Sequence, residues 1–287
     1  MGLLAERGFN VILVSRTLAK LQDVAKEISK SFNVQTKVVA VDFTSSSEIY
    51  GQIKQQIAGI EVGILINNVG MFYEFPESFL DIPEREKLIQ DMIRCNITTV
   101  PMMCSLILPQ MVQRKRGLII NISSIASVIP GPKMAIYSAS KAFVTKFSED
   151  LAAEYQSHGV DIQVMITGGV GTNMSQMEGG VFGMPTARQY VESTLRYVGY
   201  SRKTTGFFAH SFLLLTTYLM MFITPSDPED NELEQDGKDG KPEYVSDWLE
   251  DTRNKNIAGN LGAASQESDV LKLLGFETVD DETRNKG

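Results

Sequence analysis

The sequence predicts an α/β fold, a Rossmann-like, doubly wound parallel sheet with helices on both faces. Short runs rich in valine and isoleucine, typical of buried strands, alternate along the first 223 residues with longer patterns typical of amphipathic helices. A strand, a helix and a strand repeated in this order require crossover connections, which place the strands in parallel. In such a sheet, ligands bind beyond the carboxyl ends of the strands.

The strand-like runs are short, apolar and bounded by polar residues, and a helical pattern follows each of them. We expect strands at 9–15, 34–41, 62–67, 117–123 and 161–166. We expect helices at about 17–31, 45–58, 83–115, 134–157 and 186–198.

A further apolar segment, residues 207–223, carries no formal charge apart from His210. Its seventeen residues are at the short margin for a helix that spans a membrane. Three interpretations stay open: a lid over a substrate pocket, which we favour, membrane association, and an ordinary core helix.

Composition divides the chain into a body, residues 1–223, and a tail, residues 224–287. The formal net charge of −8 is the sum of +2 for the body and −10 for the tail. The tail is rich in acidic residues, glycine and proline and poor in apolar residues, so we expect it to be largely disordered. No basic stripe is present, so we expect no nucleic-acid partner.

Histidines and cysteines are few. His158 and His210 lie far apart in the sequence, near neither Cys95 nor Cys104, so we expect no metal site. We expect structural rather than catalytic roles for both histidines, His158 in a loop and His210 in an apolar segment.

Polar residues follow all five predicted strands, so they should line one crevice at the carboxyl edge of the sheet. In strand order these residues are Ser15 and Arg16; Asp42; Asn67, Asn68 and Gly70; Ser123 and Ser124; and residues 167–172.

Tyr137 and Lys141, in "AIYSASKAF" (residues 135–143), lie four residues apart and so share one face of a predicted helix. This spacing does not identify a site by itself, because Tyr50 and Lys54 repeat it. Tyr50 falls in a predicted surface helix away from the strand ends, whereas Tyr137 opens the helix that follows the Ser124 strand. We therefore interpret the Tyr50 pair as a chance match.

Together these residues resemble the short-chain dehydrogenase/reductase family. The resemblance rests on Asn-Asn-Val-Gly at 67–70, Asn96 in the long helix, Ser124 thirteen residues before Tyr137, and Lys141. "LVSRTLAKL", "VGILINNVGM" and "GLIINISS" are similar to the branch of very-long-chain 3-oxoacyl-CoA reductases and related 17-beta-hydroxysteroid dehydrogenases. The resemblance covers about residues 3–212 and does not reach the tail.

The resemblance implies reduction of a ketone by hydride transfer, with Tyr137 as the proton donor. The Lys141 ammonium should lower the pKa of the phenol and hold the nicotinamide ribose. Ser124 should donate a hydrogen bond to the carbonyl oxygen, and Asn96 should anchor a water that passes protons towards Lys141. A large apolar substrate is implied, with a 3-oxoacyl-CoA of fatty-acid elongation preferred over a 17-keto steroid.

The expected cofactor is NADPH, because Ser15 and Arg16 follow the first strand, where an acidic residue usually meets the 2′-hydroxyl of NADH. Asp42 and Asn68 should flank the adenine and its ribose, although Asp42 is also a candidate helix N-cap. By resemblance, Gly70 belongs to the cofactor site and Thr172 contacts the nicotinamide amide. Thr167 stands where the family usually has proline.

The chain departs from the family at its start, where no Thr-Gly-x-x-x-Gly-x-Gly turn is found. "MGLLAERGFN" resembles the end of the helix that should follow that turn, so we expect a truncated or alternative product, or an incomplete gene model. A missing central strand should leave a gap between the strands at 9–15 and 62–67, and an apolar hole in the core.

This departure keeps a second function open: a catalytically impaired relative with a binding or regulatory role. A nucleotide-sugar epimerase, which shares Tyr-x-x-x-Lys, fits the Asn96 and Ser124 spacing less well. The branch implies the cytosolic face of the endoplasmic reticulum membrane, or the cytoplasm if the short N-terminus is native. Membrane association through residues 207–223 and a homodimer are further expectations.

Overall fold

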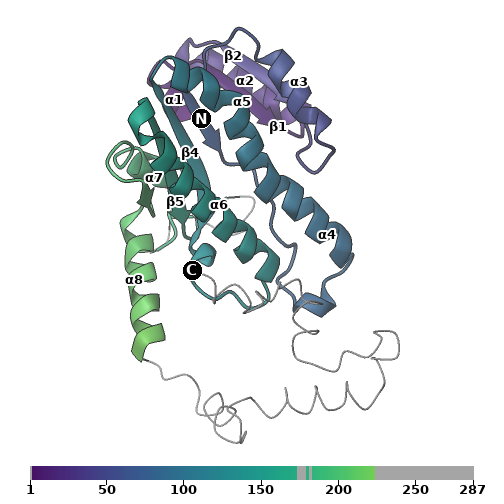
Figure 1. Cartoon of the computed structure of the whole chain (residues 1–287), viewed down its shortest axis with the longest axis vertical. Coiled ribbons are helices and arrows are strands. Elements are labelled where there is room, and N and C mark those ends of the chain that lie inside the picture. The colour runs from purple at the N-terminus through teal and green to yellow at the C-terminus, as the bar shows by residue number, and fades with distance from the viewer. Residues whose placement is uncertain (1, 173–178, 181–182, 224–287) are drawn as a thin grey trace, which may run out of the picture. The chain divides into compact units, whose positions relative to one another are not determined.

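The structure is a computed structural model that describes residues 2–172, 179–180 and 183–223. It separates two units, Met1–Leu219 and Met220–Gly287. The predicted disorder of residues 224–287 lies outside the described residues. Figure 1 shows the elements in chain order.

The first half of the chain alternates strands and helices as the sequence predicts. Its elements are α1 (Gly2–Ala5), β1 (Val11–Ser15), α2 (Leu18–Phe32), β2 (Thr36–Ala40), α3 (Glu48–Gln56), β3 (Ile64–Asn67), η1 (Phe79–Asp81), α4 (Arg85–Met92), the π-helix η2 (Ile93–Thr98) and α5 (Thr99–Gln113). The single helix expected at 83–115 is therefore α4 and α5 joined by a π-helical turn.

The second half continues the alternation and adds a short strand that the sequence did not predict. Its elements are β4 (Gly117–Ser124), η3 (Ile125–Ser127), α6 (Ala135–Tyr155), η4 (Gln156–His158), β5 (Val160–Thr167), α7 (Ala187–Thr194), β6 (Lys203–Thr204) and α8 (Phe208–Ile223). The two residues of β6 are too few to leave a periodic signal.

The strands form two separate parallel sheets. β1 pairs with β2 from Val11 opposite Thr36 to Ser15 opposite Ala40. The other sheet has the order β3-β4-β5-β6, and all its pairs are parallel. Within the described residues no strand lies between β1 and β3, so the expected gap in the sheet is confirmed.

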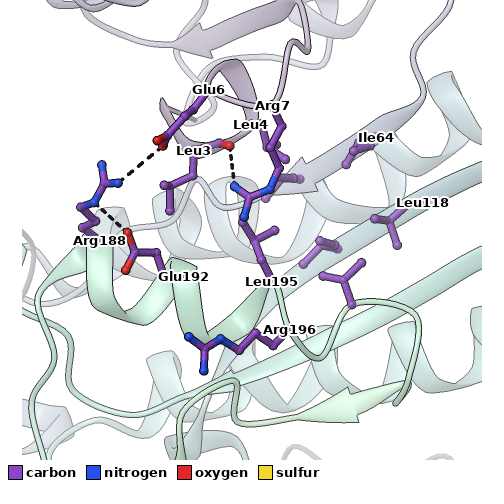
Figure 2. Close-up of a pocket in the computed structure, with 13 residues that line it drawn as sticks. Leu3, Leu4, Glu6, Arg7, Ile64, Leu118, Arg188, Glu192, Leu195 and Arg196 are labelled. Atoms are coloured by element: carbon purple, nitrogen blue, oxygen red, sulfur yellow. Dashed lines mark hydrogen bonds and ion pairs between the residues drawn. The ribbon is translucent and has the colours of Figure 1, made fainter. Parts of the chain in front are cut away.

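Alternate side chains of β3 and β4 face opposite layers of the domain. Leu65 and Ile119 are buried in the main core, which includes residues of α3, α5 and α6. Their neighbours, Ile64, Ile66 and Leu118 among them, line a cavity on the other face (Figure 2). Helices thus cover both faces, as a doubly wound sheet requires.

This cavity has a volume of about 670 Å³ and an apolar floor, and its remaining walls come from α1, α7 and the turn after α7. Its rim is charged: Arg188 forms ion pairs with Glu6 at 3.5 Å and with Glu192 at 2.8 Å (Figure 2). These side chains are largely exposed, so the pairs contribute little to stability. The cavity lies beside β3, on the side where the sequence predicted an apolar hole.

Small side chains allow α6 to approach the sheet closely. Ser140, Ser148 and Ala152 are buried on the face that packs against β4 and β5. The Ser148 hydroxyl accepts a hydrogen bond from the Asn121 amide of β4 at 2.8 Å. This close contact sets the position of Tyr137 and Lys141 on the same helix.

Candidate active site

The four residues with predicted catalytic roles come together around the carboxyl ends of β3 and β4. Ser124 is the last residue of β4, and its side chain lies close enough to Tyr137 of α6 to affect the pKa of the phenol. The Lys141 ammonium lies 5.7 Å from the centre of the Tyr137 ring. Gly70, three residues past β3, lies between Asn96 and Lys141: a Cβ there would be 3.3 Å from Asn96 Oδ1 and 3.5 Å from Lys141 Nζ.

Tyr137 sits in an apolar, partly buried setting. The Phe72 ring meets the Tyr137 ring edge to face, with the ring centres 4.7 Å apart. Burial raises the pKa of Tyr137, and the neighbouring Ser124 hydroxyl only partly opposes this. The pKa of Tyr137 is therefore raised overall, because desolvation of the phenolate dominates, whereas the sequence predicted a lowered value.

Lys141 is a buried cation, only 7% exposed. Its ammonium donates a hydrogen bond to the Ile122 carbonyl of β4 at 3.0 Å. Burial lowers its pKa from 10.5 to about 8, so the side chain is still mainly protonated at neutral pH. A charge in so dry a position acts strongly on any anion that develops beside it.

Asn96 is held by hydrogen bonds on both ends of its amide. Its Oδ1 accepts from the Met71 backbone amide at 2.8 Å, and its Nδ2 donates to the Met71 carbonyl at 2.9 Å and to Ser140 at 3.2 Å. The residue is 1% exposed and lies in the π-helix η2. Turns of this kind are frequent at functional sites, because the extra residue redirects side chains locally.

The end of β4 is tied to α6 and β5 through serine and threonine hydroxyls. Ser123 donates to the Lys141 carbonyl at 2.9 Å, while the Ser123 carbonyl accepts from Thr167 at 2.9 Å. Ser124 lies opposite Thr167 in the β4–β5 register, and its hydroxyl also accepts from the Ala126 amide. Thr167, in place of the usual proline, therefore adds a bond between the two strand ends.

The predicted adenine end of the cofactor site lies on the smaller sheet. The Ser15 carbonyl accepts from the Val41 amide at 3.0 Å, which brings Ser15, Arg16 and Asp42 to one edge. Bonds from the amide and hydroxyl of Thr44 to Asp42, and then the charge of Arg16, lower the pKa of Asp42 against the effect of burial. Asp42 thus closes its own turn.

The N-cap interpretation of Asp42 is wrong, since the N-cap residue of α3 is Ser47. Asn68 and Thr172, predicted to contact the cofactor, are both exposed. Burial raises the pKa of Cys95 in η2 to about 11, and the charge of Lys141 partly opposes this. The charges of Asp42 and Arg16 have smaller effects on the same pKa, so both halves of the predicted site lie near this thiol.

The second Tyr-x-x-x-Lys pair does not join the site. Tyr50 is 5% exposed in the main core, and its hydroxyl is 3.4 Å from Thr99 Oγ1. Lys54 is exposed on α3. Tyr50 therefore faces inward from α3, although the sequence predicted a surface position, and the pair makes no shared site.

Sequence reasoning missed several residues that support the site. Tyr73 accepts at its hydroxyl from the Ile136 amide at 3.0 Å, which fixes the start of α6. Asn121 is fully buried and accepts from Asn67 at 2.8 Å. The available signal for Asn121 was a polar residue within the apolar run "GLIINIS".

The residues present fit a nicotinamide cofactor at the end of the site formed by α6. The absence of a side chain at Gly70 leaves room beside the Lys141 ammonium, which a Cβ would enter. No glycine-rich turn joins a strand to a helix in residues 2–172, so we assign no pyrophosphate contact. The cavity of Figure 2 contains none of the predicted site residues in its lining.

The fold and this site define an oxidoreductase of the Rossmann-like, short-chain type. Residues 2–179 match the family model "short chain dehydrogenase", so the chain belongs to this family. The 7beta-hydroxysteroid dehydrogenase structure is 25% identical with a TM-score of 0.67, covering 79% of this chain and 86% of that one.

The relatives identify the branch. Very-long-chain 3-oxoacyl-CoA reductase from Anas platyrhynchos is 43% identical over 210 residues, which is 73% of this chain and 67% of that protein. The Homo sapiens protein of the same name gives the same identity and coverage. This chain therefore spans about two thirds of these relatives, and the branch predicted from the sequence is confirmed.

A nicotinamide cofactor is supported by family membership and by a solved relative. A metagenomic short-chain oxidoreductase in complex with NADP is 26% identical with a TM-score of 0.52, covering 60% of this chain and 75% of that one.

Among the described residues, one helical stretch is long and apolar enough to cross a membrane, Arg85–Gln113. Half of its most apolar window is buried inside the domain, which is also typical of the central helix of a soluble protein. The shorter apolar helix is Phe208–Met220, in the segment for which membrane association was one interpretation.

Proposed function

We propose that this chain uses NADPH to reduce the keto group of a 3-oxoacyl-CoA with a long acyl chain. The observation that carries the proposal is the grouping of Tyr137, Ser124, Lys141 and Asn96 at one strand edge, in a chain 43% identical to very-long-chain 3-oxoacyl-CoA reductases. The reduced nicotinamide supplies a hydride to the keto carbon when it is bound.

The chain's residues handle the oxygen of the keto group. The Ser124 hydroxyl donates a hydrogen bond to this oxygen, and Tyr137 transfers its phenolic proton there as negative charge develops. Lys141, charged and buried beside Tyr137, stabilises the tyrosinate that results. Since burial raises the pKa of Tyr137, the phenol is fully protonated before the reaction and suited to act as an acid.

NADPH is the proposed cofactor because β1 ends at Ser15 and Arg16 follows it directly, which places a hydroxyl and a guanidinium at the end of this strand. A guanidinium can bind a 2′-phosphate through paired hydrogen bonds, while the carboxylate typical of NADH sites would repel it. Asp42 and Asn68 are proposed contacts for the adenosine, and Thr172 for the nicotinamide amide.

The exposed side of α8 supports placement at a membrane. Phe208, Phe212, Leu215 and Leu219 are all at least half exposed, and their spacing puts them on one helix face. We propose that this face contacts the endoplasmic reticulum membrane, where a substrate with a long acyl chain resides.

Turnover of NADPH with a long-chain 3-oxoacyl-CoA tests the proposed reaction. Tyr137→Phe should lower kcat by about 10²- to 10⁴-fold. Tyr50→Phe is the matched control, because it removes a hydroxyl from the other Tyr-x-x-x-Lys pair, and it should leave kcat unchanged. Equal activity of wild type and Tyr137→Phe would contradict the assigned role of Tyr137.

A thermal unfolding scan separates the proposed enzyme from the non-enzymatic alternative. If the cofactor site is formed, NADPH should raise the midpoint temperature of unfolding, and should raise it less in Lys141→Ala. A shift by NADPH without any turnover would favour a binding or regulatory role. A wild-type transition indifferent to NADPH would contradict the cofactor assignment.

A further inference from the structure

His210 is the most enclosed polar side chain of α8, the helix whose outer face is apolar and exposed. It is 0% exposed, and it lies in the first turn of the helix. Its ring lies near the rings of Tyr190 of α7, at 5.6 Å, and Phe207, at 5.3 Å. Tyr190 in turn donates from its hydroxyl to the Thr205 carbonyl at 2.9 Å, which fixes one wall around the imidazole.

Both ring nitrogens of His210 bind the backbone that follows β5. Nδ1 accepts from the Gly168 amide at 3.1 Å, and Nε2 is 3.0 Å from the Gly169 carbonyl. An amide can only donate and a carbonyl can only accept, so the ring is the neutral tautomer with its proton on Nε2. Burial also lowers the pKa of His210, which keeps the ring neutral at physiological pH.

Gly168 leaves the space that the His210 ring occupies. A Cβ at Gly168 would lie 2.6 Å from Cδ2 and 2.8 Å from Cγ of His210, closer than real side chains approach. The imidazole therefore lies directly against the bare backbone of Gly168. Such an approach requires glycine for space alone.

Gly168 and Gly169, whose backbone binds His210, are the first two residues of the segment 168–172, which runs from the end of β5 to Thr172. Thr167, just before it, lies opposite Ser124 at the candidate active site. At its far end, the Gly171 amide donates to the Pro185 carbonyl at 3.0 Å. His210 is thus one of the attachments that hold this segment beside the site.

We propose that His210 is a positioning residue that fixes segment 168–172 beside the candidate active site and links it to α8. The role in cofactor binding rests on the proposed function, whereas the structural role does not. Without His210, segment 168–172 would lose conformational entropy when the nicotinamide binds. Loss of His210 should therefore weaken NADPH binding.

Hydrogen exchange followed by mass spectrometry, without cofactor or substrate, tests the structural role. In His210→Leu, peptides covering 168–172 should exchange at least tenfold faster, while peptides covering β4 should be unchanged. In His210→Asn, Oδ1 can replace Nδ1 as the acceptor for Gly168, so much of the protection should return. His158→Asn is the control, because His158 is exposed, and it should alter neither peptide.

Unchanged exchange of 168–172 in His210→Leu would overturn the proposal, and so would equal acceleration of the β4 peptides. If His210→Leu does not fold, His210→Ala decides: unchanged exchange of 168–172 overturns the proposal, and faster exchange confined to 168–172 supports it. The dissociation constant of NADPH should rise about tenfold in His210→Leu. Failure of wild type to bind NADPH would count against the proposed function and leave the exchange result intact.

Discussion

Replacing Lys141 with methionine should change how stability depends on pH. The Lys141 ammonium has a pKa of about 8 in the folded chain, against 10.5 for an ordinary lysine. Each factor of ten in acidity corresponds to about 1.4 kcal/mol, so burying the charged form costs about 3 kcal/mol at neutral pH. Methionine has a similar shape and no charge, and it avoids this penalty.

The direction of the pH dependence of stability follows from the pH range in which the folded and the unfolded chain each carry the proton of Lys141. Below about pH 8 the folded and unfolded chains both carry the proton, so the penalty is fully present. Between about pH 8 and 10.5 the unfolded chain holds the proton more tightly, so the stability of the wild type rises with pH. Above this range both states are neutral and the penalty is lost.

Urea unfolding of wild type and Lys141→Met at pH 7, 8, 9 and 10 measures the effect. At pH 7 the variant should be about 2 kcal/mol more stable, since the lost hydrogen bond to the Ile122 carbonyl offsets about 1 kcal/mol of the gain. By pH 10 this advantage should have fallen by roughly 2 to 3 kcal/mol, because the wild type has lost its charge.

Other lysines, tyrosines and cysteines also titrate in this range, so the informative quantity is the difference between the two proteins. Lys54→Met, at the exposed lysine of the chance pair, is the control for replacing a lysine with methionine as such. A pH-independent difference for Lys141→Met would refute the reasoning. A variant that is more stable and yet inactive would show that the buried charge is kept for function.

Three further predictions use other parts of the molecule. Arg16→Leu should lower kcat/KM for NADPH about 10- to 100-fold and leave that for NADH unchanged, which steady-state kinetics with both cofactors would detect; an equal loss with both would count against a 2′-phosphate contact. Gly168→Ala should lower the free energy of unfolding by about 1–3 kcal/mol in urea titrations, because the new Cβ would collide with the His210 ring. Gly63→Ala is the control, and it should lower the free energy of unfolding far less, because the space around Gly63 is open. In flotation with phospholipid vesicles, the double substitution Phe212→Ser and Leu215→Ser should reduce the bound fraction at least tenfold, since two exposed apolar side chains are lost; unchanged flotation would contradict membrane contact through α8.

The order of elements was predictable because buried parallel strands have continuous apolar sequences. The runs around Leu65 and Ile119 form β3 and β4 within two residues of the expected bounds. The strand ends were equally predictable, because a polar residue ends each run. This is why the sequence alone could place Ser124 and Asn67 at one edge of the sheet.

Other features depend on tertiary contacts that periodicity does not record. The π-helix around Asn96 inserts a residue into a continuous apolar pattern, so the sequence predicts one unbroken helix. The direction of the pKa shift of Tyr137 depends on how deeply the phenol is buried, and no sequence pattern measures that depth. The bonds of His210 join residues 42 positions apart, so the sequence predicts only that this histidine belongs to an apolar segment.

The gap between β1 and β3 should affect one end of the candidate site more than the other. Tyr137, Lys141 and Ser124 belong to α6 and β4, and their contacts lie within that part of the fold. Ser15, Arg16 and Asp42 lie on the two-stranded sheet, which the π-helix η2 connects to the other part through the bond from Arg94 to the Thr44 carbonyl. The proton-transfer end is therefore organised independently of the gap, while the position of the adenosine end depends on η2 and on the core around α3 and α5. For this reason cofactor affinity, rather than the arrangement around Tyr137, is the property that the gap should affect most.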